Sequence, residues 1–164
     1  MGLQVALYML LSLILTFIPI PQFLGWCWPN WIVLFFVWLT AFRPKFSALF
    51  LVWGMGLVLD LLQATYLGVH VIGLALLNLF LNQYKTKFLV YPLIQQVMIV
   101  FTAGFIYLFS TQFPYVDITF GYFFMYATLV SVVSAFIWPW LEMYSRSYVI
   151  ALNKSKFKGD IYGV

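Results

Sequence analysis

An acid and a base lie ten residues apart within otherwise apolar sequence. Asp60 ends the run Gly54-Met55-Gly56-Leu57-Val58-Leu59-Asp60, and His70 follows a short polar interruption. A carboxylate inside a membrane segment costs several kcal/mol unless it is paired or neutralised. A tight turn centred near Thr65 would place Asp60 and His70 at similar depth, from which the two side chains could pair across a helical hairpin.

Two interpretations of this pair stay open. Asp60, His70 and Gln63 could satisfy one another or cap the turn, or they could form a partner-binding or proton-linked site with Trp28 and Trp31 close by. A metal centre is not expected, because one histidine and one carboxylate fall short of the usual three or four ligands. We expect no cofactor, and an enzyme is the poorer hypothesis because paired carboxylates and a nucleophile beside a histidine are missing.

The elements that position these residues follow from an apolar composition. The 164 residues are 65% hydrophobic and only 7% charged, which is too few ionic groups to cover a soluble protein of this size. Four stretches without Asp, Glu, Lys or Arg are each long enough for a crossing of about 20 residues; they cover Met1–Phe42, Leu61–Tyr84, Phe88–Val116 and Ile118–Leu141. The sequence therefore predicts a membrane protein.

Short polar stretches divide the chain into six apolar segments. Each segment should be a helix, because backbone N–H and C=O groups in lipid must form hydrogen bonds within the protein. The segments are about Leu3–Ile20, Trp28–Phe42, Phe46–Gln63, Leu67–Tyr84, Tyr91–Gln112 and Phe120–Leu141. We predict an all-α membrane protein, a compact bundle of about six transmembrane helices. The second segment is short and begins near Pro29, so we expect it to be tilted, broken or re-entrant.

The positions of the basic residues predict how the chain is oriented in the membrane. Arg43 with Lys45, Lys85 with Lys87, and the tail beginning at Arg146 all fall on one side if six crossings start from a cytoplasmic N-terminus. Both termini are then cytoplasmic. We predict one polytopic membrane domain, residues 1–145, and a basic cytoplasmic tail, residues 146–164, disordered from about Asn153. Membrane lipid rather than nucleic acid is the expected partner of these charges, because no basic stripe with phosphate-binding groups is present.

Small and aromatic residues suggest how the bundle is held. Small side chains let helix backbones approach closely in lipid, where the hydrophobic effect does not drive helices together. We predict such close helix packing at Gly54, Gly56, Gly68, Gly73, Ala127, Ser131 and Ala135. Packing inside the bundle is the default reading of the last three, and contact with another chain is the alternative. Aromatic side chains near helix ends are expected to anchor the helices at the membrane–water interface. They include Trp26, Trp28, Trp31, Trp138 and Trp140.

Several motifs together resemble the bacterial rod shape-determining protein MreD family. They are Trp28-Pro29-Asn30-Trp31 before a helix ending at Arg43-Pro44, the Gly-containing segment ending in Asp60-Leu61, Leu67-Gly68-Val69-His70, Tyr91-Pro92-Leu93-Ile94-Gln95-Gln96, and Trp138-Pro139-Trp140. The resemblance covers about Leu3 to Arg146. Members often carry a basic residue after Leu-Gly-Val, and His70 keeps a base there.

The resemblance implies a non-enzymatic inner-membrane component of the rod (elongasome) complex, which controls cell shape and lateral peptidoglycan synthesis. Its implied partner is MreC, and through MreC the actin-like MreB, the glycosyltransferase RodA and a class B penicillin-binding transpeptidase. The family is similar in fold to the membrane substrate-binding components of energy-coupling-factor transporters. The alternative is therefore a small-molecule-binding or transport protein with an outward-facing pocket near Asp60 and His70. The sequence leaves open whether the chain forms homo-oligomers.

Overall fold

The computed structural model describes the backbone of residues 2–19, 21, 25–43, 49–112 and 120–162. Side chains are described over the same ranges except at residues 2, 3, 26, 120 and 148–162. The sequence predictions for Lys45 and for the side chains of Trp26 and the tail lie outside the described residues.

The described backbone is all-helical, which confirms the all-α part of the predicted fold class. The α-helices are α1 (Gly2–Phe17), α2 (Trp31–Phe42), α3 (Leu49–Leu62), α4 (Val69–Asn82), α5 (Leu93–Gln112) and α6 (Phe120–Tyr162), with short 3-10 helices η1 (Gly25–Cys27) and η2 (Phe88–Val90). Each α-helix falls on one of the six apolar segments. Within the described residues, two helical stretches are long and apolar enough to cross a membrane, namely α5 and residues 121–147 of α6.

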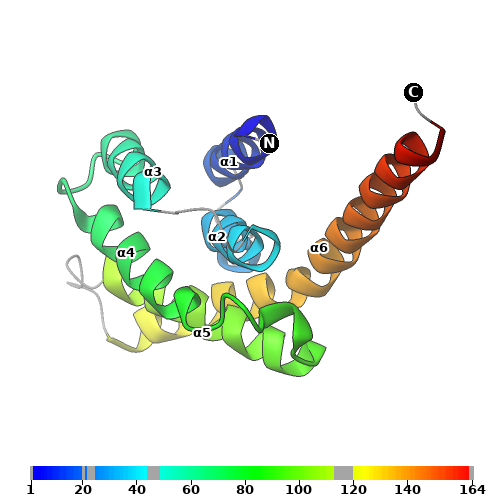
Figure 1. Ribbon diagram of the computed structural model, residues 1–164. Helices are drawn as coiled ribbons and strands as arrows, with labels where there is room; N and C mark the ends of the chain where they lie inside the picture. The colour runs from blue at the N-terminus through cyan, green and yellow to red at the C-terminus, as the bar shows by residue number, and fades with distance from the viewer. Residues whose placement is uncertain (1, 20, 22–24, 44–48, 113–119, 163–164) are drawn as a thin grey trace.

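The helices are arranged as an arc around a central helix (Figure 1). Successive helices α3, α4, α5 and α6 pack side by side, and α2 lies within the arc against α4, α5 and α6. Helix α1 packs mainly on α2, and α3 packs mainly on α4. The two helices with the fewest neighbours, α1 and α3, therefore stand on the open side of the arc.

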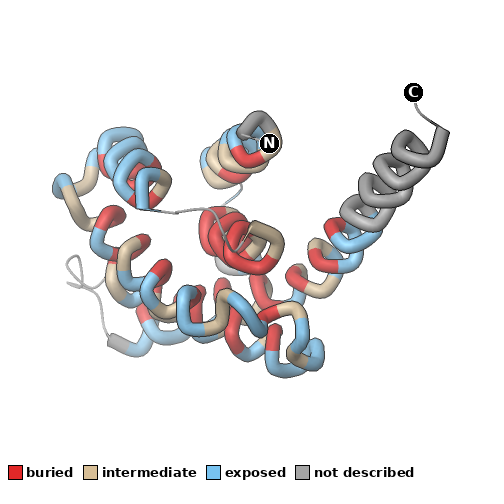
Figure 2. Tube along the Cα trace, viewed as in Figure 1, coloured by how far each residue is buried: buried red, intermediate tan, exposed pale blue. Residues whose placement is uncertain are grey.

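Helix α2 forms the centre of the core. Nine of its 12 residues are buried, as the predominantly red tube in Figure 2 shows. Asn30 begins the helix by accepting the Val33 N–H at 3.2 Å through its side-chain oxygen, a standard N-cap interaction. Pro29 therefore precedes the helix and does not occupy its first turn. The prediction of a broken second segment is wrong, because α2 is continuous and enclosed by its neighbours.

Close helix contacts occur at two of the predicted glycines. A Cβ atom on Gly56 of α3 would lie 2.7 Å from the Val71 Cα atom of α4. A Cβ atom on Gly73 of α4 would lie 2.6 Å from the Thr111 methyl group of α5. Real Cβ atoms do not approach other atoms so closely, so these two positions bring α3, α4 and α5 into direct contact.

The other two predicted glycines do not pack in this way. A Cβ atom on Gly54 would have no neighbour within 4 Å, because this face of α3 points away from α4. Gly68 also has open space around it, and its backbone φ of 102° is the feature that requires glycine. The predicted packing role is therefore wrong for both residues within this chain.

The small residues of α6 pack inside the chain, as the default interpretation proposed. Ala127, Ser131 and Ala135 are all buried. Ser131 faces Gly104 of α5, where an added Cβ atom would lie 3.0 Å from the serine hydroxyl. The stripe is thus part of the contact between α5 and α6.

The last helix is longer than predicted. Its backbone stays helical to Tyr162, beyond the predicted end at Leu141 and through the segment from Asn153 expected to be disordered. Pro139 lies inside this helix without ending it. Trp138 is fully buried on one side of the proline, and Glu142 and Arg146 form an ion pair on the other. Side-chain contacts are therefore present on both sides of Pro139. The C-terminal part of α6 extends away from the bundle (Figure 1).

Candidate functional site

The Asp60 carboxylate lies at the centre of the hairpin between α3 and α4. Its Oδ1 atom accepts the His70 backbone N–H at 2.9 Å, and its Oδ2 atom accepts the Gly68 N–H at 2.7 Å. The Thr65 hydroxyl donates to Oδ1 at 3.1 Å. Asp60 is 1% exposed and His70 is 4% exposed. The predicted pair is therefore present, and it is buried.

These bonds make Asp60 the cap of the following helix. The N-cap residue of α4, Gly68, has no side chain to bond the first N–H groups of that helix. Asp60 supplies the acceptor from the end of α3, and its negative charge lies at the positive end of the α4 dipole. The positive φ of Gly68 turns the chain so that both N–H groups point at one carboxylate. The hairpin thus explains why an acid is tolerated here.

The imidazole of His70 is oriented by the same carboxylate. His70 Nδ1 lies 2.8 Å from Asp60 Oδ1. This oxygen already accepts the His70 backbone N–H, so Nδ1 is best assigned as a further donor to it. The remaining ring nitrogen, Nε2, is then free to accept a hydrogen bond from another group when the imidazole is neutral.

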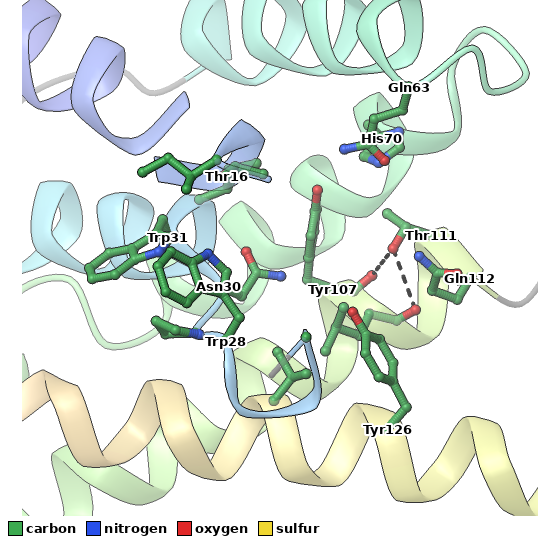
Figure 3. Close-up of a pocket in the computed structure, with 16 residues that line it drawn as sticks. Thr16, Trp28, Asn30, Trp31, Gln63, His70, Tyr107, Thr111, Gln112 and Tyr126 are labelled. Atoms are coloured by element: carbon green, nitrogen blue, oxygen red, sulfur yellow. Dashed lines mark hydrogen bonds between the residues drawn. The ribbon is translucent and has the colours of Figure 1, made fainter. Parts of the chain in front are cut away.

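A cavity of about 320 Å³ opens beside this hairpin. Its walls come from the ends of α1 and α3, the segment before α2, the start of α4, and the facing parts of α5 and α6 (Figure 3). Four of the residues predicted from the sequence line it, namely Trp28, Trp31, Gln63 and His70. Asp60 is not in the wall but lies behind His70.

Other polar side chains in the wall were not predicted. Tyr107, Thr111 and Gln112 come from α5, Tyr126 comes from α6, and Asn30 precedes α2. Figure 3 shows Tyr107 rising between the side that carries His70 and Gln63 and the side that carries Asn30 and Trp28. These residues are far apart in the sequence except for the three on α5, so only the packing of α5 and α6 against α2 reveals that they meet.

Hydrogen bonds fix the wall formed by the segment before α2. The Trp28 indole N–H donates to the Leu15 carbonyl of α1 at 3.1 Å. The Asn30 backbone N–H donates to the Ser134 hydroxyl of α6 at 2.8 Å. The rings of Trp28 and Trp31 meet edge to face, with centroids 6.1 Å apart. Both tryptophans are therefore held in place by contacts within the bundle.

A second polar cluster lies between α5 and α6 and was missed by sequence reasoning. The Trp138 indole N–H donates to Gln96 Oε1 at 2.9 Å, and the Gln96 amide donates to Glu142 Oε1 at 3.3 Å. Arg146 bonds the same glutamate oxygen and also the Leu89 carbonyl at 2.8 Å. Trp138 is completely buried, so its predicted role as an interface anchor is wrong. The four-residue spacing of Glu142 and Arg146 was the available signal.

Neither cluster provides a metal centre. Among the residues whose side chains are described, no group of three or more His, Cys, Asp or Glu side chains is close enough to hold a metal ion. Asp60 already accepts four hydrogen bonds from the protein. The described wall of the cavity offers hydrogen-bonding groups and aromatic rings.

The described residues define a helical protein with a buried acid–base hairpin and a polar cavity at one end of the bundle. A family model described as rod shape-determining protein MreD matches residues 2–148. The chain belongs to the MreD family and is a rod shape-determining membrane component. This family is not a known enzyme family. Searches of curated proteins and of solved structures gave no match.

Proposed function

We propose that this chain is an inner-membrane scaffold of the rod complex that binds MreC and so contributes to lateral peptidoglycan synthesis. Membership of the MreD family is the observation that carries this proposal. MreB, RodA and a class B penicillin-binding transpeptidase are proposed to connect through MreC. The chain would cross the membrane six times in a fold like that of energy-coupling-factor substrate-binding components, with residues 1–145 as the membrane domain and residues 146–164 as a basic cytoplasmic tail.

Contacts within the bundle support cytoplasmic termini. Arg43 at the end of α2 donates to Gln4 near the N-terminus at 2.7 Å. Arg146 donates to Leu89, which follows the loop containing Lys85 and Lys87. These basic residues therefore gather at one end of the bundle, and the cavity lies at the other. The positive-inside rule then assigns the basic end to the cytoplasm and the cavity to the outer side.

The outer face of α3 is the surface we propose for the membrane anchor of MreC. Phe50, Trp53 and Leu61 on this helix are 89%, 62% and 71% exposed. Gly54 lies among them with open space above its Cα atom. Helix association in lipid depends on close van der Waals packing, which a glycine within a surface of large side chains favours. An apolar helix from MreC could therefore approach α3 closely at Gly54.

Co-purification of tagged MreC from solubilised membranes tests this surface. Gly54→Leu adds bulk to the proposed contact without a clash inside the chain. We expect it to reduce recovered MreC at least about tenfold, while the amount of folded protein stays normal. Gly121→Leu is the matched control, because Gly121 on α6 also has no neighbour within 4 Å of an added Cβ atom. Equal recovery of MreC with both variants would eliminate the α3 face as the docking site.

A second function is supported by the cavity itself. We propose that it binds a small molecule from the outer side, either for transport or as a signal to the complex. The converging polar side chains of His70, Gln63, Tyr107 and Thr111 favour this function, because ligand sites combine apolar walls with a few placed polar groups. Native mass spectrometry of the purified protein tests it, and an empty preparation together with normal MreC binding would favour the scaffold alone.

A further inference from the structure

The lining of the cavity indicates what kind of small molecule it suits. We propose that it binds a neutral, polyhydroxylated ligand of about the size of a mono- or disaccharide. This inference rests on the second function proposed above and specifies its ligand. It is carried by the charge, the hydrogen-bonding groups and the aromatic surfaces of the described wall.

The charge of the wall favours a neutral ligand. Among the described residues that line the cavity, none is Lys, Arg, Asp or Glu. Asp60, which lies behind His70, is turned to the hairpin, where both of its oxygens accept hydrogen bonds from Thr65, Gly68 and His70. A phosphate, a carboxylate or an ammonium group would lose its hydration here without meeting a Lys, Arg, Asp or Glu side chain among these residues.

The hydrogen-bonding groups of the wall include both donors and acceptors. Asn30 uses its side-chain oxygen to cap α2, which leaves its amide N–H groups as donors. The Thr111 hydroxyl donates to the Tyr107 carbonyl at 3.0 Å, which leaves its oxygen lone pairs as acceptors. His70 Nε2 provides another acceptor when neutral, and Gln63 carries both kinds of group. A sugar hydroxyl both donates and accepts, so it matches such a mixed wall.

The aromatic rings provide apolar surface for the rest of such a ligand. Trp28 and Trp31 stand edge to face on one wall, and Tyr126 lies on α6. The negative faces of aromatic rings attract the polarised C–H groups that cover one side of a pyranose ring. The volume of about 320 Å³ is at the small end of ligand cavities, which span about 300–1,000 Å³. It therefore suits one or two sugar rings.

Equilibrium dialysis with radiolabelled probes tests the proposal. The protein should be held in phospholipid nanodiscs, because maltoside detergents carry sugar head groups that would compete. The probes are glucose, maltose, glucose 6-phosphate as the charged control, and nicotinamide as a planar neutral control. The double variant Gln63→Leu/Gln112→Leu removes two amides from the wall. Gln83→Leu makes the same change at an exposed position at the end of α4 remote from the cavity.

We expect saturable binding of glucose or maltose, at least about tenfold tighter than binding of glucose 6-phosphate. The double variant should weaken sugar binding about tenfold through loss of hydrogen bonds, and Gln83→Leu should leave it unchanged. Sugar binding that the double variant leaves intact would overturn the site. Preferred binding of nicotinamide, lost in the double variant, would overturn the ligand class while the second function stands. No binding of any probe, with an empty native mass spectrum, would overturn both.

Discussion

Removal of the Asp60 carboxylate should strongly destabilise the hairpin between α3 and α4. Asp60→Ala leaves the N–H groups of Gly68 and His70 without the acceptor that they have at 2.7 and 2.9 Å. The His70 N–H is buried, so leaving it unpaired costs about 1–3 kcal/mol. The part-buried Gly68 N–H adds a smaller cost. The loss of charge at the start of α4 adds to this cost. We therefore expect a lower free energy of unfolding even though alanine suits a helix.

Thermal midpoints in detergent, measured by fluorescence-detection size-exclusion chromatography, give the comparison. At about 2–4 °C per kcal/mol, Asp60→Ala should lower the midpoint by at least about 2 °C. Asp60→Asn keeps one acceptor oxygen and should fall between the wild type and Asp60→Ala. Thr65→Val removes only the hydroxyl that donates at 3.1 Å and should have the smallest effect. If Asp60→Ala and Thr65→Val melt at the same temperature, the capping role assigned to the carboxylate is refuted.

Two further predictions concern helix packing and topology. Gly56→Ala should lower the thermal midpoint, because its Cβ atom would lie 2.7 Å from the Val71 Cα atom. Gly54→Ala should leave the midpoint unchanged, because an added Cβ atom there has no neighbour within 4 Å. Equal midpoints of the two variants would contradict the close contact between α3 and α4. Cys27, which is exposed near the cavity end, should react with a membrane-impermeant maleimide added outside the inner membrane of cells with a permeabilised outer membrane. A cysteine at Lys87 in a Cys27→Ser background should react only after lysis, and the opposite pattern would reverse the proposed orientation.

The helices were predictable because apolar runs in this chain end at polar or helix-breaking residues. The limits of α5 are close to the prediction, since Pro92 precedes the helix and Gln112 ends it. The end of α6 was not predictable from hydropathy, because charged residues after Leu141 end an apolar run but do not end a helix. The start of α2 was predicted slightly too early. The helix was expected to begin near Pro29, whereas Asn30 is its N-cap residue and Trp31 its first helical residue.

The acid–base pair was predictable from symmetry about a turn, but its detailed role was not. Equal distances of Asp60 and His70 from Thr65 placed them at one depth. Sequence alone does not show that Gly68 adopts a positive φ and aims two backbone N–H groups at the carboxylate. The polar part of the wall on α5 was also hidden, because Tyr107 lies between apolar residues like an ordinary core position and Thr111 falls in the polar end of the apolar segment.

The second polar cluster shows how the two ends of the bundle are connected. Gln96, Glu142 and Arg146 join α5 to α6 at the basic end, while Asp60 and His70 join α3 to α4 at the cavity end. Gln96 and Tyr107 are on the same helix, and α5 packs against both α4 and α6. A shift of α5 caused by an occupant of the cavity would therefore strain the Gln96–Glu142 contact. Helix α5 therefore connects the cavity physically with the basic end of the bundle.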